Sequence, residues 1–143
     1  MSDALGTNTA PGFEKHPGYE VAIEPCARQI TVEFNGKVIA DSNRAFLVLE
    51  TRHAAVFYFP QADVRMDLAR RTDQSTYCPF KGQASYWTLT VGDRTEEDVI
   101  WAYEAPYDEV MGLKGYVSFY WDRMDSWTED GVAVDSPTDP RES

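Results

Sequence analysis

The clearest structural signal in this chain is the stretch Gln29-Ile30-Thr31-Val32-Glu33-Phe34-Asn35-Gly36-Lys37-Val38-Ile39-Ala40. Ile30, Val32 and Phe34 alternate with polar residues, which is the pattern of a strand with one buried face. The Asn-Gly pair that follows favours the two-residue type I′ turn between antiparallel strands. The stretch therefore predicts a β-hairpin and, with it, an antiparallel sheet.

Other segments extend this β pattern along the chain. Alternating apolar residues at 86–91, the turn signal Gly92-Asp93 and renewed alternation at 99–103 predict a second hairpin. Residues 54–59 form an apolar run that Pro60 stops, so a strand is expected there, whereas the apolar run 45–50 stays ambiguous. The remaining expectations are a helical turn at 60–64, a two-turn helix at 107–113 with Val110, Met111 and Leu113 directed inward, and an aromatic strand at 116–121. The sum is a mainly β domain, a bent sheet or open barrel with one or two short helices.

Composition narrows the class of protein. The chain has 143 residues, which suits a single domain, and its net charge of -11 repels phosphate backbones and anionic lipids. We therefore expect neither a general nucleic-acid binder nor a membrane-surface binder. The first residues show no signal-peptide pattern and no apolar run reaches membrane-spanning length, so a cytoplasmic protein is expected. Cys26 and Cys78 form no C-x-x-C motif and should be free thiols there.

The two ends of the chain differ from its middle. Residues 1–15 and 131–143 are rich in Gly, Pro, Ser, Thr or Asp and lack periodicity, which indicates loose or wrapped terminal arms. Residues 16–130 should form the single β domain. No internal repeat or interdomain linker is present in the sequence.

Several short motifs resemble one known family. They are His16-Pro17-Gly18, Ile23-Glu24-Pro25, 38–42, Leu49-Glu50, Tyr58-Phe59-Pro60 with Asp63-Val64, Thr72, 76–87, Trp101-Ala102-Tyr103 with Pro106, Gly115-Tyr116 and Phe119-Tyr120. The chain from about 16 to 127 thereby resembles the small, mostly bacterial proteins known as domain of unknown function 427, sometimes labelled nucleotidyltransferase-like. The resemblance implies a compact β-tent fold, which related modules often combine with zinc held by paired C-x-x-C motifs. This chain lacks those pairs, and it lacks the Gly-Ser and spaced acids that a Mg²⁺-dependent nucleotidyltransferase needs.

The segment 76–87 is the strongest candidate for a functional site, because a thiol, an amine and several aromatic rings crowd into it. Cys78 is a candidate nucleophile if the Lys81 cation activates it, and the alternative is a small buried apolar side chain. Lys81 with Gly82 could hold a phosphate or carboxylate, and the alternative is a solvated turn.

Charged residues outside this segment supply further candidates. Arg44 and Arg65, in a stretch that also holds Arg70 and Arg71, could grip an anion, or they could simply pair with neighbouring acids. Glu50 and Asp63 are weak candidates for general acid or base catalysis. His16 and His53 have no metal-ligand spacing, so neither a metal site nor a cofactor is expected.

Aromatic residues on the predicted strands could line a ligand pocket or pack in the core. Tyr86 and Trp87 must lie on opposite faces of their strand, so at most one of them faces a given pocket. The favoured hypothesis is a small-molecule binding domain for an anionic or aromatic ligand, bound by Arg44, Tyr58, Arg65, Cys78, Lys81, Tyr86 and Tyr103. The alternatives are a protein-interaction module, including a homodimer, and a cysteine-dependent enzyme.

Overall fold

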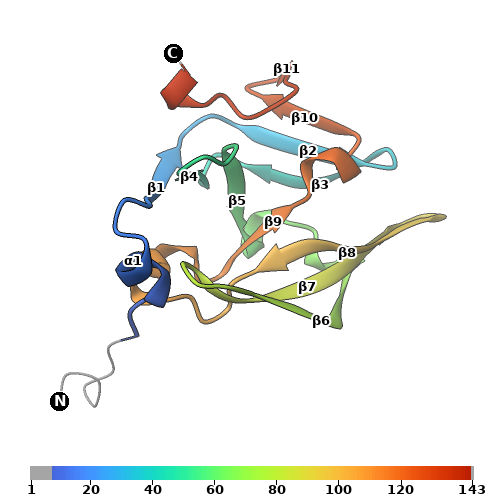
Figure 1. Cartoon of the computed structure of the whole chain (residues 1–143). Coiled ribbons are helices and arrows are strands. Elements are labelled where there is room, and N and C mark those ends of the chain that lie inside the picture. Colours follow the sequence, from blue (N-terminus) through green and yellow to red (C-terminus); the bar gives the residue numbers. More distant parts are fainter. Residues whose placement is uncertain (1–7, 143) are drawn as a thin grey trace.

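The computed structural model describes residues 8–142 and confirms the mainly β class (Figure 1). All strands pair antiparallel in two sheets, with the orders β1-β4-β5-β9-β8-β7-β6 and β11-β10-β2-β3. The strands are β1 (Val21–Cys26), β2 (Ile30–Phe34), β3 (Lys37–Ser42), β4 (Ala45–Glu50), β5 (Val56–Pro60), β6 (Ala69–Cys78), β7 (Gly82–Val91), β8 (Arg94–Ala102), β9 (Tyr116–Phe119), β10 (Ser126–Glu129) and β11 (Val132–Ala133). The helical elements are α1 (Pro11–Lys15) and the 3-10 turns η2 (Gln61–Asp63), η3 (Met66–Leu68), η4 (Asp108–Leu113), η5 (Trp121–Arg123) and η6 (Pro140–Glu142).

Both predicted hairpins are present. In the first, β2 and β3 are joined by Asn35 and Gly36, whose φ angles of 48° and 79° are those of a type I′ turn. Ile30, Val32 and Phe34 are fully buried, as their alternation predicts. The second hairpin is β7 with β8, and the ambiguous run 45–50 forms the strand β4.

The main core lies between the two sheets. Figure 1 shows the four-stranded sheet on one side of the molecule and β6, β7 and β8 on the other, with β5 and β9 between them. Phe34 from β2, Phe57 and Phe59 from β5, Leu89 from β7 and Trp127 from β10 all belong to this core cluster. Packing these apolar faces together removes them from water, which is the main stabilising contribution expected for such a domain.

A second apolar cluster covers the opposite face of the seven-stranded sheet. Tyr58, Tyr86 and Tyr103 belong to it, and η4 adds Val110 and Leu113. Trp87 belongs to the main core instead, so Tyr86 and Trp87 do lie on opposite faces. The strand alternation thus places the tyrosines on one shared surface.

Some elements differ from the expectations. Four strands, β1, β6, β10 and β11, were not predicted; β6 is mostly exposed and polar, so it carries no hydrophobic alternation. The predicted helix at 107–113 is a 3-10 segment whose backbone is non-helical at Val110. Val110 and Leu113 are buried, but Met111 is 44% exposed, so its inward direction was wrong.

The terminal segments make defined contacts wherever the structure describes them. Residues 1–7 of the expected N-terminal arm, which include the segment searched for a signal peptide, lie outside the described residues. After them, the Gly12 N–H donates to the carbonyl of Pro79, and Ala10 is buried. In the C-terminal segment, β11 pairs with β10 and Arg141 reaches back to β4. Among the described residues, no helix is both long and apolar enough to cross a membrane.

Candidate ligand site around Lys81

Lys81 is fixed by the tight turn that joins β6 to β7. Its N–H donates to the carbonyl of Cys78 at 3.3 Å, and its own carbonyl accepts from the N–H of Tyr107 at 3.1 Å. Gly82 follows with a φ of +115°, a conformation that L side chains rarely adopt, so glycine is needed there. The turn therefore directs the Lys81 side chain inward, where only 7% of it is exposed.

The Lys81 ammonium meets a carboxylate from a distant strand. Its Nζ lies 2.5 Å from Oε1 of Glu50, the last residue of β4, and the Tyr19 hydroxyl donates to Oε2 of the same carboxylate. Burial by itself would raise the pKa of Glu50, but the hydrogen bonds from Lys81 and Tyr19 outweigh it and leave that pKa lowered. Glu50 is therefore a charged acceptor at neutral pH.

Cys78 lies beside this ion pair. Lys81 Nζ is 3.9 Å from Cys78 Sγ, so the ammonium contacts both the Glu50 carboxylate and the thiol. Cys78 is partly exposed and free of any disulfide. The sequence prediction that Lys81 and Cys78 act together is thus geometrically possible, and Cys78 is not the fully buried apolar side chain of the alternative.

Three tyrosines of the second apolar cluster complete the group. Tyr58 accepts a hydrogen bond from Trp101 Nε1 at 3.0 Å, and Tyr86 shares one with Thr76 at 2.8 Å. The ring of Tyr103 has Lys81 Nζ 5.9 Å from its centre. Burial raises the pKa of both Tyr58 and Tyr103, so these two phenols keep their protons at neutral pH.

We call the group Glu50, Tyr58, Cys78, Lys81, Tyr86 and Tyr103 the Lys81 site. Its members come from β4, β5, the end of β6, the turn after it, β7 and the residue that follows β8, and burial is the main cause of the raised pKa of Tyr103 among them. The site combines an ammonium, a carboxylate, a thiol and phenol donors on an aromatic surface. Such a set can orient a ligand through hydrogen bonds while rings contact its apolar part.

The other predicted residues lie elsewhere. Arg44 precedes β4, at the opposite end of that strand from Glu50, and pairs with Asp63 at 2.7 Å. Arg65 pairs with Asp67 at 2.8 Å, and its backbone N–H bonds to Ile39 of the other sheet. Both arginines are exposed and bound to local acids, so the structure does not bring Arg44, Asp63 or Arg65 to the Lys81 site.

An aromatic wall covers one side of the site, and the sequence analysis missed it. The rings of Tyr19 and Phe80 stack with centres 3.8 Å apart, and Phe13 of α1 packs edge-on against Phe80 at 5.0 Å. Tyr19 lies before β1, far from the other site residues in sequence, and no motif marks it. Its role as a donor to Glu50 becomes visible only when the chain is folded.

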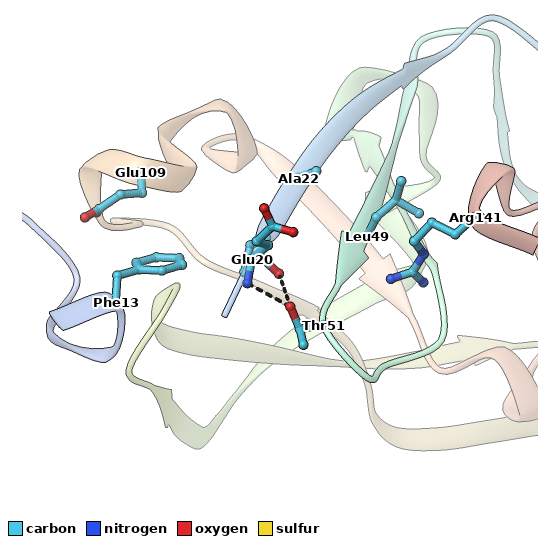
Figure 2. A pocket seen from close by; sticks show the side chains of 8 residues that line it. Phe13, Glu20, Ala22, Leu49, Thr51, Glu109 and Arg141 are labelled. Atoms are coloured by element: carbon cyan, nitrogen blue, oxygen red, sulfur yellow. Dashed lines mark hydrogen bonds between the residues drawn. The ribbon is translucent and has the colours of Figure 1, made fainter. Parts of the chain in front are cut away.

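A cavity of about 660 Å³ lies beside β1 and was not predicted either. Figure 2 shows Phe13 and Glu109 on one side of it, Leu49 and Arg141 on the other, and Glu20 and Ala22 between them. Tyr19 and Glu50, which belong to the Lys81 site and its wall, are the immediate chain neighbours of Glu20 and Thr51 of this cavity. The two features therefore adjoin the same pair of strands.

Comparison with known proteins identifies one family. A search of the curated proteins gave no match. The family described as domain of unknown function DUF427, with the short name NTP_transf_9, matches residues 22–130. This range includes β1 apart from its first residue, β2 to β10, and all of the Lys81 site. Because the match covers most of the sequence, the chain belongs to the DUF427 family.

Proposed function

We propose that this protein binds a small organic ligand with an aromatic ring and an anionic, hydrogen-bond-accepting group at the Lys81 site. Lys81 and the phenols would meet the anionic group. The ring would lie against the aromatic surface of the same sheet face, where Phe46, Trp101 and Tyr116 are only half-buried.

The main support for this proposal is that the Tyr103 hydroxyl has no described partner in the free protein. Within the described part of the chain, this hydroxyl has no hydrogen-bond partner, although the residue is only 9% exposed. The Tyr58 hydroxyl accepts from Trp101, and its own hydrogen has no described acceptor. Among the described residues the Tyr103 oxygen is not a fully enclosed atom, so its O–H can donate to a hydrogen-bond-accepting ligand next to the Lys81 ammonium.

A thermal-shift screen with the purified protein tests this proposal. The probes are benzoate and phenyl phosphate, with acetate and inorganic phosphate as controls for the anionic group alone. We expect the aromatic anions to raise Tm, because a ligand that binds only the folded state stabilises it. No stabilisation by any aromatic anion would contradict the proposal.

Two matched variants locate the binding. Tyr103→Phe removes only the unpartnered hydroxyl and should lower affinity by about tenfold, which is about 1.4 kcal/mol and typical of a hydrogen bond to a charged group. Tyr77→Phe is the control, because Tyr77 is 59% exposed and bonds to Tyr107 away from the site. Equal effects of both variants would place the ligand elsewhere.

A second candidate function is supported by the distance between Lys81 Nζ and Cys78 Sγ, 3.9 Å. A cation next to the sulfur is a feature of many reactive cysteines. Cysteine-dependent chemistry requires Cys78 to react with iodoacetamide near pH 7 much faster than Cys26, which is buried and serves as an internal control. Equal, slow labelling of the two thiols would eliminate this candidate.

We also place the protein in the cytoplasm. Both cysteines are free, as expected of a protein from a reducing compartment. Fractionation of cells that express the untagged protein would test this location.

A further inference from the structure

The strand β1 forms one edge of the seven-stranded sheet, and it differs from the strand at the other edge. The outer strand β6 carries Arg70, Arg71 and Asp73 and is largely exposed, which is how sheets ordinarily prevent pairing with other chains. By contrast, β1 begins with three half-buried apolar residues, Val21, Ala22 and Ile23. The edge at β1 is therefore suited to pairing.

Within the described part of the chain, the backbone of β1 has unpaired hydrogen-bonding groups along this edge. The N–H of Thr51 donates to the carbonyl of Glu20, so alternate residues from Glu20 onward face β4 and those between them, Val21, Ile23 and Pro25, face outward. Pro25 fits this pattern because it has no N–H to offer β4. Among the described residues, nothing pairs with the outward N–H and carbonyl groups of Val21 and Ile23.

The cavity of about 660 Å³ lies along the same part of β1 (Figure 2). Val21 and Ala22 contribute to it, with Phe13 and Leu49 as further apolar walls. A strand added beside β1 would project its side chains toward these walls, alternately to one face of the sheet and the other. The cavity thus offers room for side chains next to unpaired backbone groups.

The charged side chains around the cavity that lack a described ion-pair partner are acidic. The Glu20 carboxylate makes no hydrogen bond or ion pair with any described residue, and the Glu109 carboxylate accepts only the N–H of Ala10, at 2.9 Å. Arg141 also borders the cavity, but its guanidinium is engaged with Asp139 and with the carbonyls of Glu50 and His53. A basic side chain would complement the two carboxylates.

We propose that β1 binds an extended, basic peptide segment of a partner protein by strand addition. The backbone of the segment pairs with Val21 and Ile23, its apolar side chains contact Phe13 and Leu49, and a lysine or arginine meets Glu20 and Glu109. Recognition of this kind draws affinity from main-chain hydrogen bonds and specificity from side-chain pockets. The peptide would pair with the edge of β1 and would contact none of the six residues that define the Lys81 site.

An NMR titration of the full chain tests the proposal with the blocked pentapeptide Val-Lys-Val-Lys-Val. We expect the amide signals of Val21 and Ile23 to shift most. Two further peptides are N-methylated, one at the central valine and one at both lysines. Because successive N–H groups of a strand point in opposite directions, only one of the two should lose affinity, by about tenfold.

Charge variants provide the second arm of the test. Glu20→Gln should weaken peptide binding by about two- to fivefold, as removal of one exposed ion pair does, and Val-Glu-Val-Glu-Val should bind more weakly still. The control is Glu24→Gln, because Glu24 is exposed on the same strand but does not line the cavity.

Three results would overturn the proposal. The first is equal binding of both N-methylated peptides. The second is binding of hexylamine with the same amide shifts, which would mark a small-amine site. The third is a concentration-dependent dimer in sedimentation experiments with the Val21 and Ile23 amides protected, which would show that the edge pairs with a second copy of the chain.

Discussion

Lys81 Nζ lies 2.5 Å from Glu50 Oε1, although one residue follows β6 and the other ends β4. Both side chains are largely buried, and the Tyr19 hydroxyl satisfies the second carboxylate oxygen. A buried ion pair of this kind adds little stability compared with apolar side chains of the same size, but the loss of one partner leaves an uncompensated charge. Removing one partner should therefore destabilise the protein more than replacing both partners together.

Replacing Lys81 with methionine should lower the free energy of unfolding by about 3 kcal/mol, because Glu50 then stays buried without its cation. The double variant Lys81→Met with Glu50→Gln should recover a substantial part of this loss. Urea denaturation of the three proteins measures both effects. A double variant no more stable than Lys81→Met would show that the lysine stabilises by packing alone.

The stability of the pair should depend on pH with a definite sign. The folded state lowers the pKa of Glu50 below its ordinary value of 4.5, so the unfolded chain binds this proton more readily. The contribution is therefore present above pH 4.5 and is lost as the pH falls through the lower pKa of the folded state.

Urea denaturation of wild type and Glu50→Gln between pH 7 and pH 3 measures this dependence. The difference in unfolding free energy between the two proteins should change in favour of Glu50→Gln as the pH falls. The control Glu24→Gln replaces an exposed glutamate whose carboxylate makes no hydrogen bond or ion pair with any described residue, so we expect a smaller change with pH for this variant. A constant difference for Glu50→Gln would contradict the lowered pKa.

Two tyrosine hydroxyls of the Lys81 site should contribute differently to stability. Tyr58→Phe removes the acceptor of the part-buried Trp101 Nε1–H and should destabilise the protein by about 1 kcal/mol. Tyr103→Phe removes a hydroxyl without a described partner and should change stability by less than about 0.5 kcal/mol. Chemical denaturation in the absence of ligand compares them, and equal losses would mean that the Tyr103 hydroxyl is also bonded in the free protein.

The contact between α1 and the loop before Lys81 can be tested with one methyl group. A Cβ at Gly12 would lie 2.7 Å from the Phe80 ring and 2.9 Å from the Pro79 carbonyl oxygen, so Gly12→Ala must displace one of them. We expect a loss of about 1 to 3 kcal/mol. Gly18→Ala is the matched control, since its Cβ would meet nothing within 4 Å. Thermal melts of both variants measure this effect. Equal Tm values for the two variants would contradict the packing of α1 on Phe80.

Only some residues of the candidate site could be predicted from the sequence. The segment 76–87 was identified by its composition, and Cys78, Lys81 and Tyr86 do lie in the site. Arg44 and Arg65 were proposed with them because arginine suits anions, but each pairs with a carboxylate outside the site. Arg65 meets Asp67, two residues along the chain, which involves little loss of chain entropy. Arg44 meets Asp63, 19 residues away, and that pairing depends on the fold.

The sequence by itself determined the class of fold. Alternation at 30–34 and 86–91 and the Asn35-Gly36 turn act over neighbouring residues, so they specify hairpins without knowledge of the rest of the chain. The tertiary structure alone decided which strands lie at the edges, that Tyr19 and Glu50 meet Lys81, and that a cavity borders β1. These features depend on contacts between residues tens of positions apart, and only the packing of the two sheets brings such residues together.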